Sequence, residues 1–251
     1  MNIPCPPKGA QAALRAIRLL KCFSTEQSQM SLVKISNISG LNKTTVHRLL
    51  RALQSEGFIE RDSVTAEYRL GAGLMALGVQ ALTSSDLRRR VRPLLQALAN
   101  NTGETVTLEV PVENSMLILD EIRSRYVIGS SGYIGTRWPL HATSTGKAVM
   151  AFADDGLEHL IEPLKALTSR TLIDKHSFQS EFISIRRRGY AVAIDELEDG
   201  FTTVATVIRG ALGEVQGALS IGGPTQRLTL KKRIELGTSL QQAASRLNQN
   251  F

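Results

Sequence analysis

Residues 31–57 constrain the fold of this chain more than any other segment, because they carry the pattern of two amphipathic helices joined by a tight glycine turn. Ser31 and Asn42 are residue types that cap helix N-termini, and Gly40 is typical of the residue that ends a helix. In the second helix, four apolar residues recur at helical spacing and predict one buried stripe: Val46, Leu49, Leu50 and Leu53. The segment therefore predicts a helix-turn-helix, in which the second helix lies in the major groove of DNA.

The opposite stripe of the second helix is polar and suits contact with nucleic acid. Hydroxyl, imidazole and guanidinium groups follow one another at helical spacing on one face: Thr44, His47, Arg48 and Arg51. Such groups hydrogen-bond to base edges and to phosphates. We expect Thr44, Thr45, His47 and Arg48 to face the groove, and we assign Lys43 and Arg51 mainly to phosphate contacts.

Two further patterns complete a small domain around this helix pair. A helix over residues 12–23 is expected to bury one apolar side, made of Ala13, Ala16, Ile17, Leu20 and Phe23. Short strands over 58–61 and 67–70 predict a hairpin, the wing of a winged helix-turn-helix domain that spans residues 1–72. Arg61 and Arg69 lie on this hairpin, where each is either a DNA contact or a solvated strand charge.

The charge distribution supports nucleic-acid binding. Up to Gly73 the chain carries ten Lys and Arg residues against five Asp and Glu residues, so this part holds +5 of the net charge of +7. A basic excess on the segment with the helix-turn-helix pattern is the electrostatic footprint expected of a DNA-binding domain. The alternative is a winged helix that contacts only other proteins, because the motif by itself is only moderately specific.

Composition argues against several other classes of protein. The apolar runs are short and interrupted by charge, and none approaches the ~20 residues that cross a bilayer, so we expect no membrane association. The N-terminus lacks the apolar stretch of a signal peptide, and Cys5 and Cys22 are the only cysteines, which favours a reducing cytoplasm. The four histidines show no short metal-ligand spacing. We therefore predict neither a metal site nor a cofactor.

The rest of the chain predicts a linker and a second domain. Residues 73–84 predict an apolar linker helix, whose face of Leu74, Leu77 and Ala81 suits packing against a partner chain or against its own domain. The arginines of a helix over 86–100 either approach DNA or form a solvated, ion-paired face. Residues 85–251 predict an α+β domain with an antiparallel sheet, with strands over 105–110, 115–122, 190–195, 203–209 and 215–221 and helices over 146–152, 177–188 and 229–247.

With these parts in order, the chain resembles the IclR family of bacterial transcriptional regulators along nearly its whole length. The segments that carry the resemblance are residues 19–23, 44–50, 68–71, 139–148 and 217–224. The resemblance implies a DNA-binding regulator with a GAF-like C-terminal domain that binds a small organic molecule, often a carboxylate or an aromatic acid. It also implies homodimers that pair into tetramers, and a dimer would place two recognition helices on successive major-groove faces about 34 Å apart.

The resemblance also implies where the effector binds. The family's pocket positions correspond here to Ala142, Ser144, Thr145, Gly146, Asp195, Thr203 and Ser220. The first of these precede a predicted helix, whose free N–H groups and dipole favour an anion. Two departures alter the pocket, because Thr203 replaces a common cysteine and Gly222 replaces a second serine. Trp138 and Tyr133 lie on a glycine-rich loop nearby, where they either cover the ligand or serve as packing.

A small hydrolase is the alternative that the residue types keep open. Ser144, His141 and Asp195 are the residue types of a catalytic triad. No Gly-x-Ser-x-Gly elbow is present, and His141 and Ser144 are only three positions apart. An attached DNA-binding pattern would also be unexplained in such an enzyme. We therefore predict a regulator without catalytic residues.

Overall fold

The computed structural model describes residues 9–24, 27–126, 134–153 and 155–248 of the 251-residue chain. The chain divides into two compact units, Met1–Ser84 and Ser85–Phe251, and each is described here by itself. Among the described helices, none is both long and apolar enough to span a membrane. The described residues also contain no group of three or more His, Cys, Asp or Glu side chains placed to hold a metal ion.

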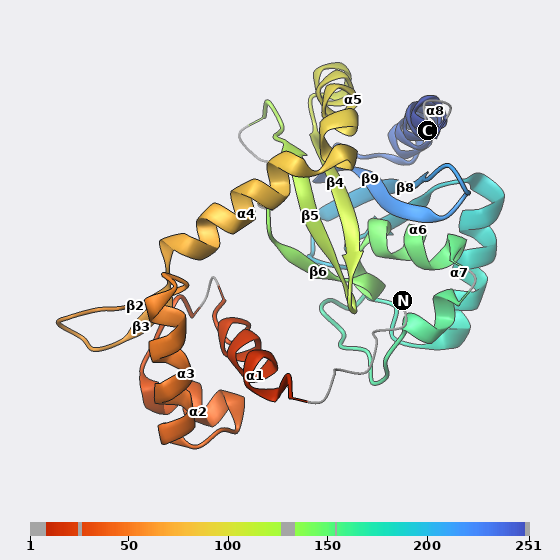
Figure 1. Cartoon of the computed structure of the whole chain (residues 1–251). Helices are drawn as coiled ribbons and strands as arrows, with labels where there is room; N and C mark the ends of the chain where they lie inside the picture. The colour runs from red at the N-terminus through yellow and green to blue at the C-terminus, as the bar shows by residue number, and fades with distance from the viewer. Residues whose placement is uncertain (1–8, 25–26, 127–133, 154, 249–251) are drawn as a thin grey trace. The chain divides into compact units, whose positions relative to one another are not determined.

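The first unit is a winged helix-turn-helix, as the sequence predicts (Figure 1). Its elements are α1 (Gln11–Leu20), β1 (Gln29–Met30), α2 (Leu32–Ser39), α3 (Lys43–Ser55), β2 (Ile59–Arg61), β3 (Tyr68–Leu70) and α4 (Ala72–Ser84). The three strands form one antiparallel sheet in the order β1-β3-β2. The hairpin β2-β3 is the predicted wing. Strand β1 was missed because two residues are too few to show an alternating pattern.

The predicted caps fix where the two central helices begin. The Ser31 hydroxyl accepts a hydrogen bond from the Lys34 backbone N–H at 3.3 Å, and the Asn42 side-chain oxygen accepts one from the Thr45 N–H at 2.8 Å. Gly40 has a φ of +68°, the left-handed conformation that ends α2 and that glycine adopts without strain. The turn between α2 and α3 is therefore specified locally by the sequence.

The core of the first unit contains the predicted stripe of α3 and corrects the predicted face of α1. Its buried residues are Leu19, Met30, Ile35, Val46, Leu49, Leu50, Leu53, Ile59 and Tyr68. In α1, Leu19 is buried and Ala16 and Leu20 pack beside it, whereas Ala13 is exposed and Ile17 is 51% exposed. Phe23 also packs on this core, but it follows the end of the helix at Leu20. The prediction for Ala13 and Ile17 was wrong because α1 presents the face of residues 16, 19 and 20 to the core, and a run of apolar residues does not say which face that is.

The second unit is the predicted α+β domain. Its elements are α5 (Asp86–Thr102), β4 (Thr105–Val112), β5 (Ser115–Ile122), β6 (Arg137–Pro139), α6 (Ser144–Phe152), α7 (Lys175–Arg188), β7 (Ala191–Ile194), β8 (Phe201–Arg209), β9 (Val215–Pro224) and α8 (Leu230–Asn248), with short 3-10 turns at Leu140–Ala142 and Gly156–His159. The strands form one antiparallel sheet in the order β6-β5-β4-β9-β8-β7. Strand β6 is an edge strand of three residues that the sequence analysis did not predict.

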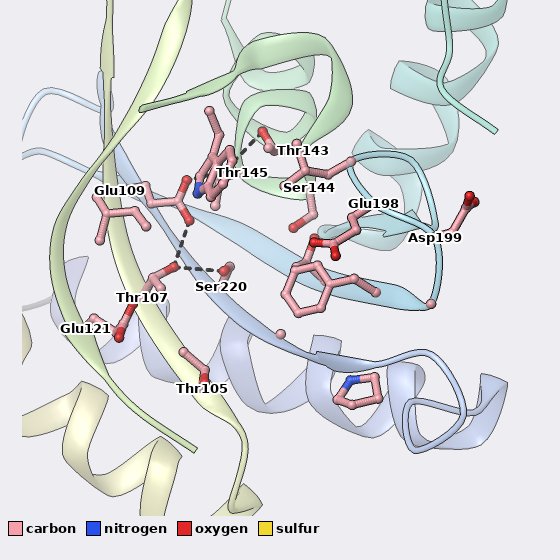
Figure 2. A pocket seen from close by; sticks show the side chains of 18 residues that line it. Thr105, Thr107, Glu109, Glu121, Thr143, Ser144, Thr145, Glu198, Asp199 and Ser220 are labelled. Carbon is pink, nitrogen blue, oxygen red and sulfur yellow. Dashed lines mark hydrogen bonds between the residues drawn. The ribbon is translucent and has the colours of Figure 1, made fainter. Parts of the chain in front are cut away.

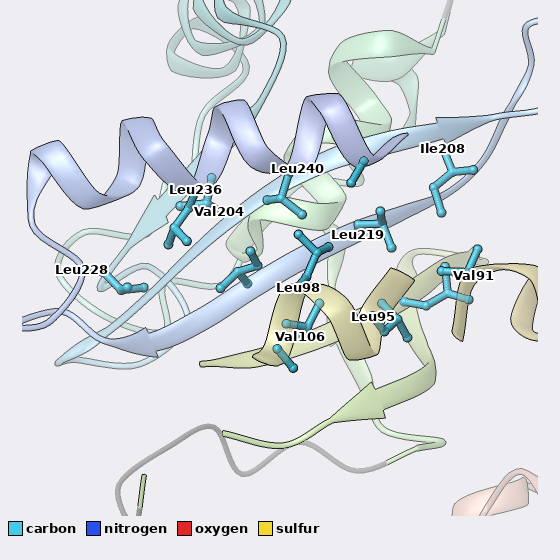
Figure 3. Close-up of a cluster of buried hydrophobic side chains, with 14 residues drawn as sticks. Val91, Leu95, Leu98, Val106, Val204, Ile208, Leu219, Leu228, Leu236 and Leu240 are labelled. Carbon is cyan, nitrogen blue, oxygen red and sulfur yellow. The ribbon is translucent and has the colours of Figure 1, made fainter. Parts of the chain in front are cut away.

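Helices cover both faces of this sheet (Figure 1). On one face, α5 and α8 pack on β4, β8 and β9 around a core that includes Leu95, Leu219 and Leu240 (Figure 3). On the other face, α6 and α7 pack on β7, β8 and β9 around Met150 and Phe178. Successive residues of a strand point to opposite faces, so β8 and β9 each supply both cores.

The arginines at the start of α5 form ion pairs within the second unit. Arg88 Nε lies 3.3 Å from Asp120 Oδ2, Arg92 also pairs with Asp120, and Arg89 pairs with Asp86. The Asp120 side chain is fully buried, so removing its arginine partners would leave an uncompensated charge in the interior. Of the two interpretations of this basic segment, the structure supports an ion-paired face for these three arginines.

Candidate functional site

The polar face of α3 is open to solvent in the first unit. Lys43, Thr44, His47, Arg48 and Arg51 are exposed, and Thr45 is half-buried. Within the described part of the chain, the side chains of His47, Arg48 and Arg51 have no hydrogen bond or ion pair. The buried stripe of Val46, Leu49, Leu50 and Leu53 fixes the rotation of the helix and thereby presents these groups to solvent. They are therefore available for contacts with bases and phosphates.

The two wing arginines are less available. Arg69 donates from Nε and Nη2 to Glu60 Oε2 at 3.0 and 2.8 Å, so a neighbouring carboxylate offsets its charge. The Arg61 guanidinium lies 5.5 Å from the centre of the Tyr68 ring. Both arginines are exposed, and water screens an exposed ion pair, so DNA can displace the Arg69–Glu60 pair at little cost. Wing contact remains a prediction for both residues.

A cavity of about 280 Å³ lies in the second unit, on the face of the sheet that α6 covers (Figure 2). Its walls come from β4, β5, β8 and β9, from the edge strand β6, from the start of α6 and from the loop before β8. The lining residues are Thr105, Thr107, Glu109, Ile118, Glu121, Trp138, Thr143, Ser144, Thr145, Leu197, Glu198, Asp199, Gly200, Phe201, Thr203, Ser220, Gly222 and Pro224. Alternation along β4 explains the polar floor, because residues 105, 107 and 109 face the cavity while Val106 and Leu108 face the opposite core.

A row of hydrogen bonds crosses the floor of the cavity (Figure 2). Thr145 Oγ1 donates to Glu109 Oε2 at 2.7 Å, and Thr107 Oγ1 donates to Glu109 Oε1 at 2.8 Å. The hydroxyls of Thr107 and Ser220 lie 2.9 Å apart, on residues that are paired between β4 and β9. Glu109 is only 5% exposed. Burial raises the pKa of Glu109 above its usual range, and the hydrogen bonds from Thr145 and Thr107 offset only part of that effect.

Two other polar groups of the cavity wall lack a partner in the described part of the chain. Ser144 is 1% exposed, and its Oγ makes no hydrogen bond there. Glu121 Oε1 accepts from Arg123 Nε at 3.0 Å, whereas Glu121 Oε2 is buried without a partner. Burial raises the pKa of Glu121, and Arg123 works against this rise. Buried polar atoms usually have partners, so these two atoms mark places where a ligand can donate or accept a hydrogen bond.

Local packing at the start of α6 explains two residues of this segment, Thr143 and Gly146. Thr143 caps the helix, since its hydroxyl accepts from the Gly146 N–H at 3.1 Å. A side chain at Gly146 would meet the Leu140 carbonyl oxygen at 2.1 Å, so this position requires glycine for close packing. Ser144, Thr145, Thr203 and Ser220 line the cavity, whereas Ala142 and Gly146 are buried beside it without lining it.

Asp195 departs from the predicted arrangement, because it is not among the described residues that line the cavity. Its Oδ1 accepts hydrogen bonds from the Gly200 N–H at 3.0 Å and from Thr225 Oγ1 at 2.5 Å. Its backbone has a φ of +56°, at the turn where β7 ends. The carboxylate therefore orders the loop of residues 195–200, part of which forms the cavity wall, instead of facing a ligand.

The sequence analysis missed the residue at the centre of the site, Glu109, together with Thr107, Glu121 and Phe201. One signal was present, because Thr105, Thr107 and Glu109 alternate with apolar residues along an otherwise apolar strand. That pattern is equally typical of a strand with one solvated face, and only the position of α6 over the strand distinguishes the two. Trp138 does line the cavity, whereas Tyr133 lies outside the described residues.

The structure does not assemble the triad of the hydrolase alternative. His141 Nε2 lies 2.9 Å from the Lys165 carbonyl oxygen, and the Asp195 carboxylate is engaged by Gly200 and Thr225. Neither group is hydrogen-bonded to Ser144, whose hydroxyl has no partner among the described residues. A serine nucleophile needs a base within hydrogen-bond reach and a third group that orients the base. The geometry of these three side chains does not support acyl transfer.

Both units match models of one protein family. Residues 12–63 match the IclR helix-turn-helix domain, and residues 79–249 match the C-terminal domain of the bacterial transcriptional regulator IclR. The chain belongs to the IclR family. It is therefore a transcriptional regulator with a helix-turn-helix DNA-binding domain and a C-terminal ligand-binding domain, and its family relatives are regulators of transcription and not enzymes.

Individual IclR-family proteins are similar over nearly the whole chain. The glycerol operon regulatory protein of Streptomyces coelicolor is 33% identical over 226 residues, which are 88% of this chain and 87% of that protein. The crystal structure of a putative IclR regulator from a Silicibacter species has 28% identity and a TM-score of 0.85, with 95% of each chain covered. An IclR homologue from Microbacterium hydrocarbonoxydans, solved in complex with 4-hydroxybenzoate, has 25% identity and a TM-score of 0.79, with 95% of this chain and 98% of that chain covered.

Proposed function

We propose that this IclR-family regulator contacts its operator through the exposed face of α3 and is controlled by a small organic effector in the cavity between α6 and the sheet. Thr44, Thr45, His47 and Arg48 then face the groove, and Lys43 and Arg51 contact phosphate. The observation that carries the DNA part is the set of exposed α3 side chains without partners, on the part of the chain that holds most of the net charge. A regulator of chromosomal DNA acts in the cytoplasm.

Replacing Arg48 by Ala tests the DNA part. If Arg48 contacts a guanine through two hydrogen bonds, the variant should lose about 1–3 kcal/mol of operator affinity, roughly 5- to 150-fold, with little loss on unrelated DNA. The measurement is a fluorescence anisotropy titration with an operator obtained by selection from random duplexes. The matched control is Arg187→Ala, because it removes the same charge from an exposed position on α7 in the second unit, outside α3 and the wing, and should change affinity by much less.

Three outcomes would count against this proposal. An equal loss on operator and unrelated DNA would make Arg48 a phosphate contact and would leave base recognition to Thr44, Thr45 and His47. Unchanged operator binding in Arg48→Ala would contradict the assigned face of α3. Weak dependence on salt would favour the protein-contact alternative, since phosphate contacts release counterions and make affinity fall steeply as salt rises.

The effector part is supported by the size and chemistry of the cavity. Ser144, Thr145, Thr203 and Ser220 present hydroxyl groups at positions where the family binds its effector, and Trp138 and Phe201 supply aromatic surface. The 4-hydroxybenzoate bound to the Microbacterium homologue supports small aromatic molecules as the first class to screen, with aromatic acids compared against their uncharged analogues. Ala142 and Gly146 would contribute through their backbone, and Asp195 through the loop that it orders.

We also propose that two copies associate through α4 and that such dimers pair into tetramers. This helix is apolar along most of its length, yet none of its residues is buried, and Met75 is 67% exposed. Leu77 and Val79 are also exposed, so the helix presents apolar surface that no described part of its own chain covers. A two-fold dimer would cover that surface and supply two recognition helices for an operator with two half-sites.

A further inference from the structure

The charges around the effector cavity are of one sign. Four of the described lining residues carry carboxyl groups: Glu109, Glu121, Glu198 and Asp199. No described lining residue is Lys, Arg or His. Glu198 and Asp199 are exposed, so water screens their charges. Glu109 and Glu121 are different, because Glu109 is 5% exposed and the Glu121 side chain is 4% exposed. A ligand in this cavity therefore meets two poorly solvated carboxyl groups.

Glu109 has no basic partner to offset its charge. Both of its oxygens are held by hydroxyl groups, from Thr107 and Thr145. Lys147, the basic residue of α6, is engaged elsewhere, since its Nζ donates to Glu196 Oε1 at 2.5 Å and to the Val192 carbonyl oxygen at 2.7 Å. The charge of Glu121 is partly offset, because the exposed Arg123 pairs with one of its oxygens.

The anion-favouring end of α6 is also occupied by the protein itself. Thr145 lies in the first turn of that helix, and its hydroxyl donates to Glu109 at 2.7 Å. The chain thus places a carboxyl group of its own next to the positive end of the helix dipole. A second carboxylate at that end would lie close to Glu109 within a poorly solvated site, where like charges disfavour each other.

From this arrangement we infer that the cavity selects a small organic molecule without negative charge that presents a hydroxyl or ammonium hydrogen-bond donor to Glu109, and that it discriminates against carboxylates. The inference rests on the proposal that this cavity is the effector site. A donor on the ligand gains a charge-assisted hydrogen bond to a carboxylate, whereas a carboxylate gains none and adds repulsion. The unpartnered Ser144 Oγ and Glu121 Oε2 offer two further contacts to the same molecule.

The remaining walls suit a flat or compact molecule. Ile118, Trp138 and Phe201 form apolar and aromatic surface beside the polar floor. The space next to Gly222 is already filled, because a side chain there would meet the Phe201 ring at 2.9 Å and the Thr203 methyl group at 3.0 Å. Phe201 therefore takes the place that a serine at position 222 would occupy, and the wall on this side is apolar where the family pattern has a hydroxyl.

A series of small molecules that differ in one functional group tests the inference on the full chain. The probes are 4-hydroxybenzyl alcohol, 4-hydroxybenzylamine and 4-hydroxybenzoate, with a five-carbon alditol and its aldonate as a second, acyclic pair. Binding is measured by isothermal titration calorimetry at about pH 7 and about pH 8.5, up to about 10 mM probe, a range that reaches millimolar dissociation constants. Burial raises the pKa of Glu109, so the preference against the acid should grow as the higher pH ionises this carboxyl group. We expect the alcohol or the amine to bind at least about tenfold more tightly than the matched acid.

Variants connect this selectivity with Glu109. Glu109→Gln keeps the shape of the side chain and removes its charge, and a threonine hydroxyl can turn to accept from the amide NH2 that replaces one carboxylate oxygen. The variant should therefore reduce the preference against the acid by about tenfold. The control is Glu158→Gln, which makes the same change at an exposed position outside the cavity and should leave the preference unchanged. Circular dichroism and operator binding confirm that each variant is folded, and the comparison of probes on the unmodified chain needs no variant.

The possible outcomes separate this inference from the function on which it rests. If the acid binds more tightly than the matched alcohol and amine, the inference is wrong, but the proposal that this cavity binds the effector is unaffected. A preference for the alcohol or amine that persists unchanged in Glu109→Gln would overturn the assignment to Glu109. No binding by any probe, with operator binding intact, would count against the cavity as an effector site and therefore against both.

Discussion

Glu109 should make the stability of the second unit depend on pH. Burial raises the pKa of this carboxyl group in the folded chain, so between the unfolded and the folded pKa the native state binds more protons than the unfolded state. The free energy of unfolding therefore falls as pH rises through that window. The glutamine of the Glu109→Gln variant does not titrate, so the variant should not lose stability in this way. The free energy of unfolding of the variant minus that of the unmodified chain should therefore increase with pH.

Urea unfolding followed by Trp138 fluorescence checks this expectation between about pH 5 and about pH 8. Trp138 is the only tryptophan and lines the same cavity, so it reports on the second unit. Burial raises the pKa of Glu196 as well, but Glu196 is present in both proteins and its contribution cancels in the difference. Glu121 repels Glu109, so the measured difference includes this interaction. Parallel stability curves for Glu109→Gln and the unmodified chain would show that Glu109 titrates normally.

At the scale of single residues, the sequence predicted several hydroxyl-bearing residues of the cavity but not its buried glutamates. Ser144, Thr145, Thr203 and Ser220 line the cavity, and the resemblance to the IclR family had pointed to all four. Glu109 escaped notice because a glutamate in a strand is usually a solvated charge, and its burial depends on a helix that begins 35 positions later. The role of Asp195 was unpredictable for the same reason, since its partner Thr225 lies 30 positions away.

The N-cap of α3 gives a prediction at the scale of an element. Asn42 accepts a hydrogen bond from the Thr45 N–H at 2.8 Å, and replacing a capping Asn by Ala costs about 0.5–2 kcal/mol. Asn42→Ala should destabilise the first unit by this amount and speed hydrogen exchange in α3. Urea unfolding followed by Trp138 fluorescence serves as an internal control, because Trp138 belongs to the second unit and its transition should not move.

The helix-turn-helix could be predicted almost completely, because local signals specify it. Caps, a glycine turn and a buried stripe all lie within residues 31–57, so no distant contact was needed to find it. Helix α1 shows the limit of this reasoning, since the choice between Ile17 and Leu19 as the buried residue depends on how α1 lies on α2 and α3. Strand β6 shows another limit, because three residues become a strand only through pairing with β5.

The exposed α4 gives the first prediction at the scale of the whole molecule. If two chains associate through this helix, Leu77→Glu should weaken association, because it places a charge in an apolar interface. Sedimentation velocity should then show a smaller species, and operator binding should weaken because the two recognition helices are no longer linked. Gln80→Glu adds a charge to an exposed polar residue of the same helix and is the matched control. An unchanged sedimentation profile in Leu77→Glu would place the interface elsewhere.

Coupling between the cavity and the DNA gives the second prediction at this scale. Any probe that regulates operator binding must have different affinities for the free and the DNA-bound regulator, because equal affinities shift no equilibrium. By linkage, a saturating probe must change the operator affinity by the same factor by which saturating operator changes the probe affinity. A coupling free energy of about 1–3 kcal/mol corresponds to a factor of roughly 5 to 150. Anisotropy measures the first factor and calorimetry the second, with the tightest-binding probe of the series. A probe that binds the cavity while both factors stay at one would show that occupancy of this cavity does not control the α3 face.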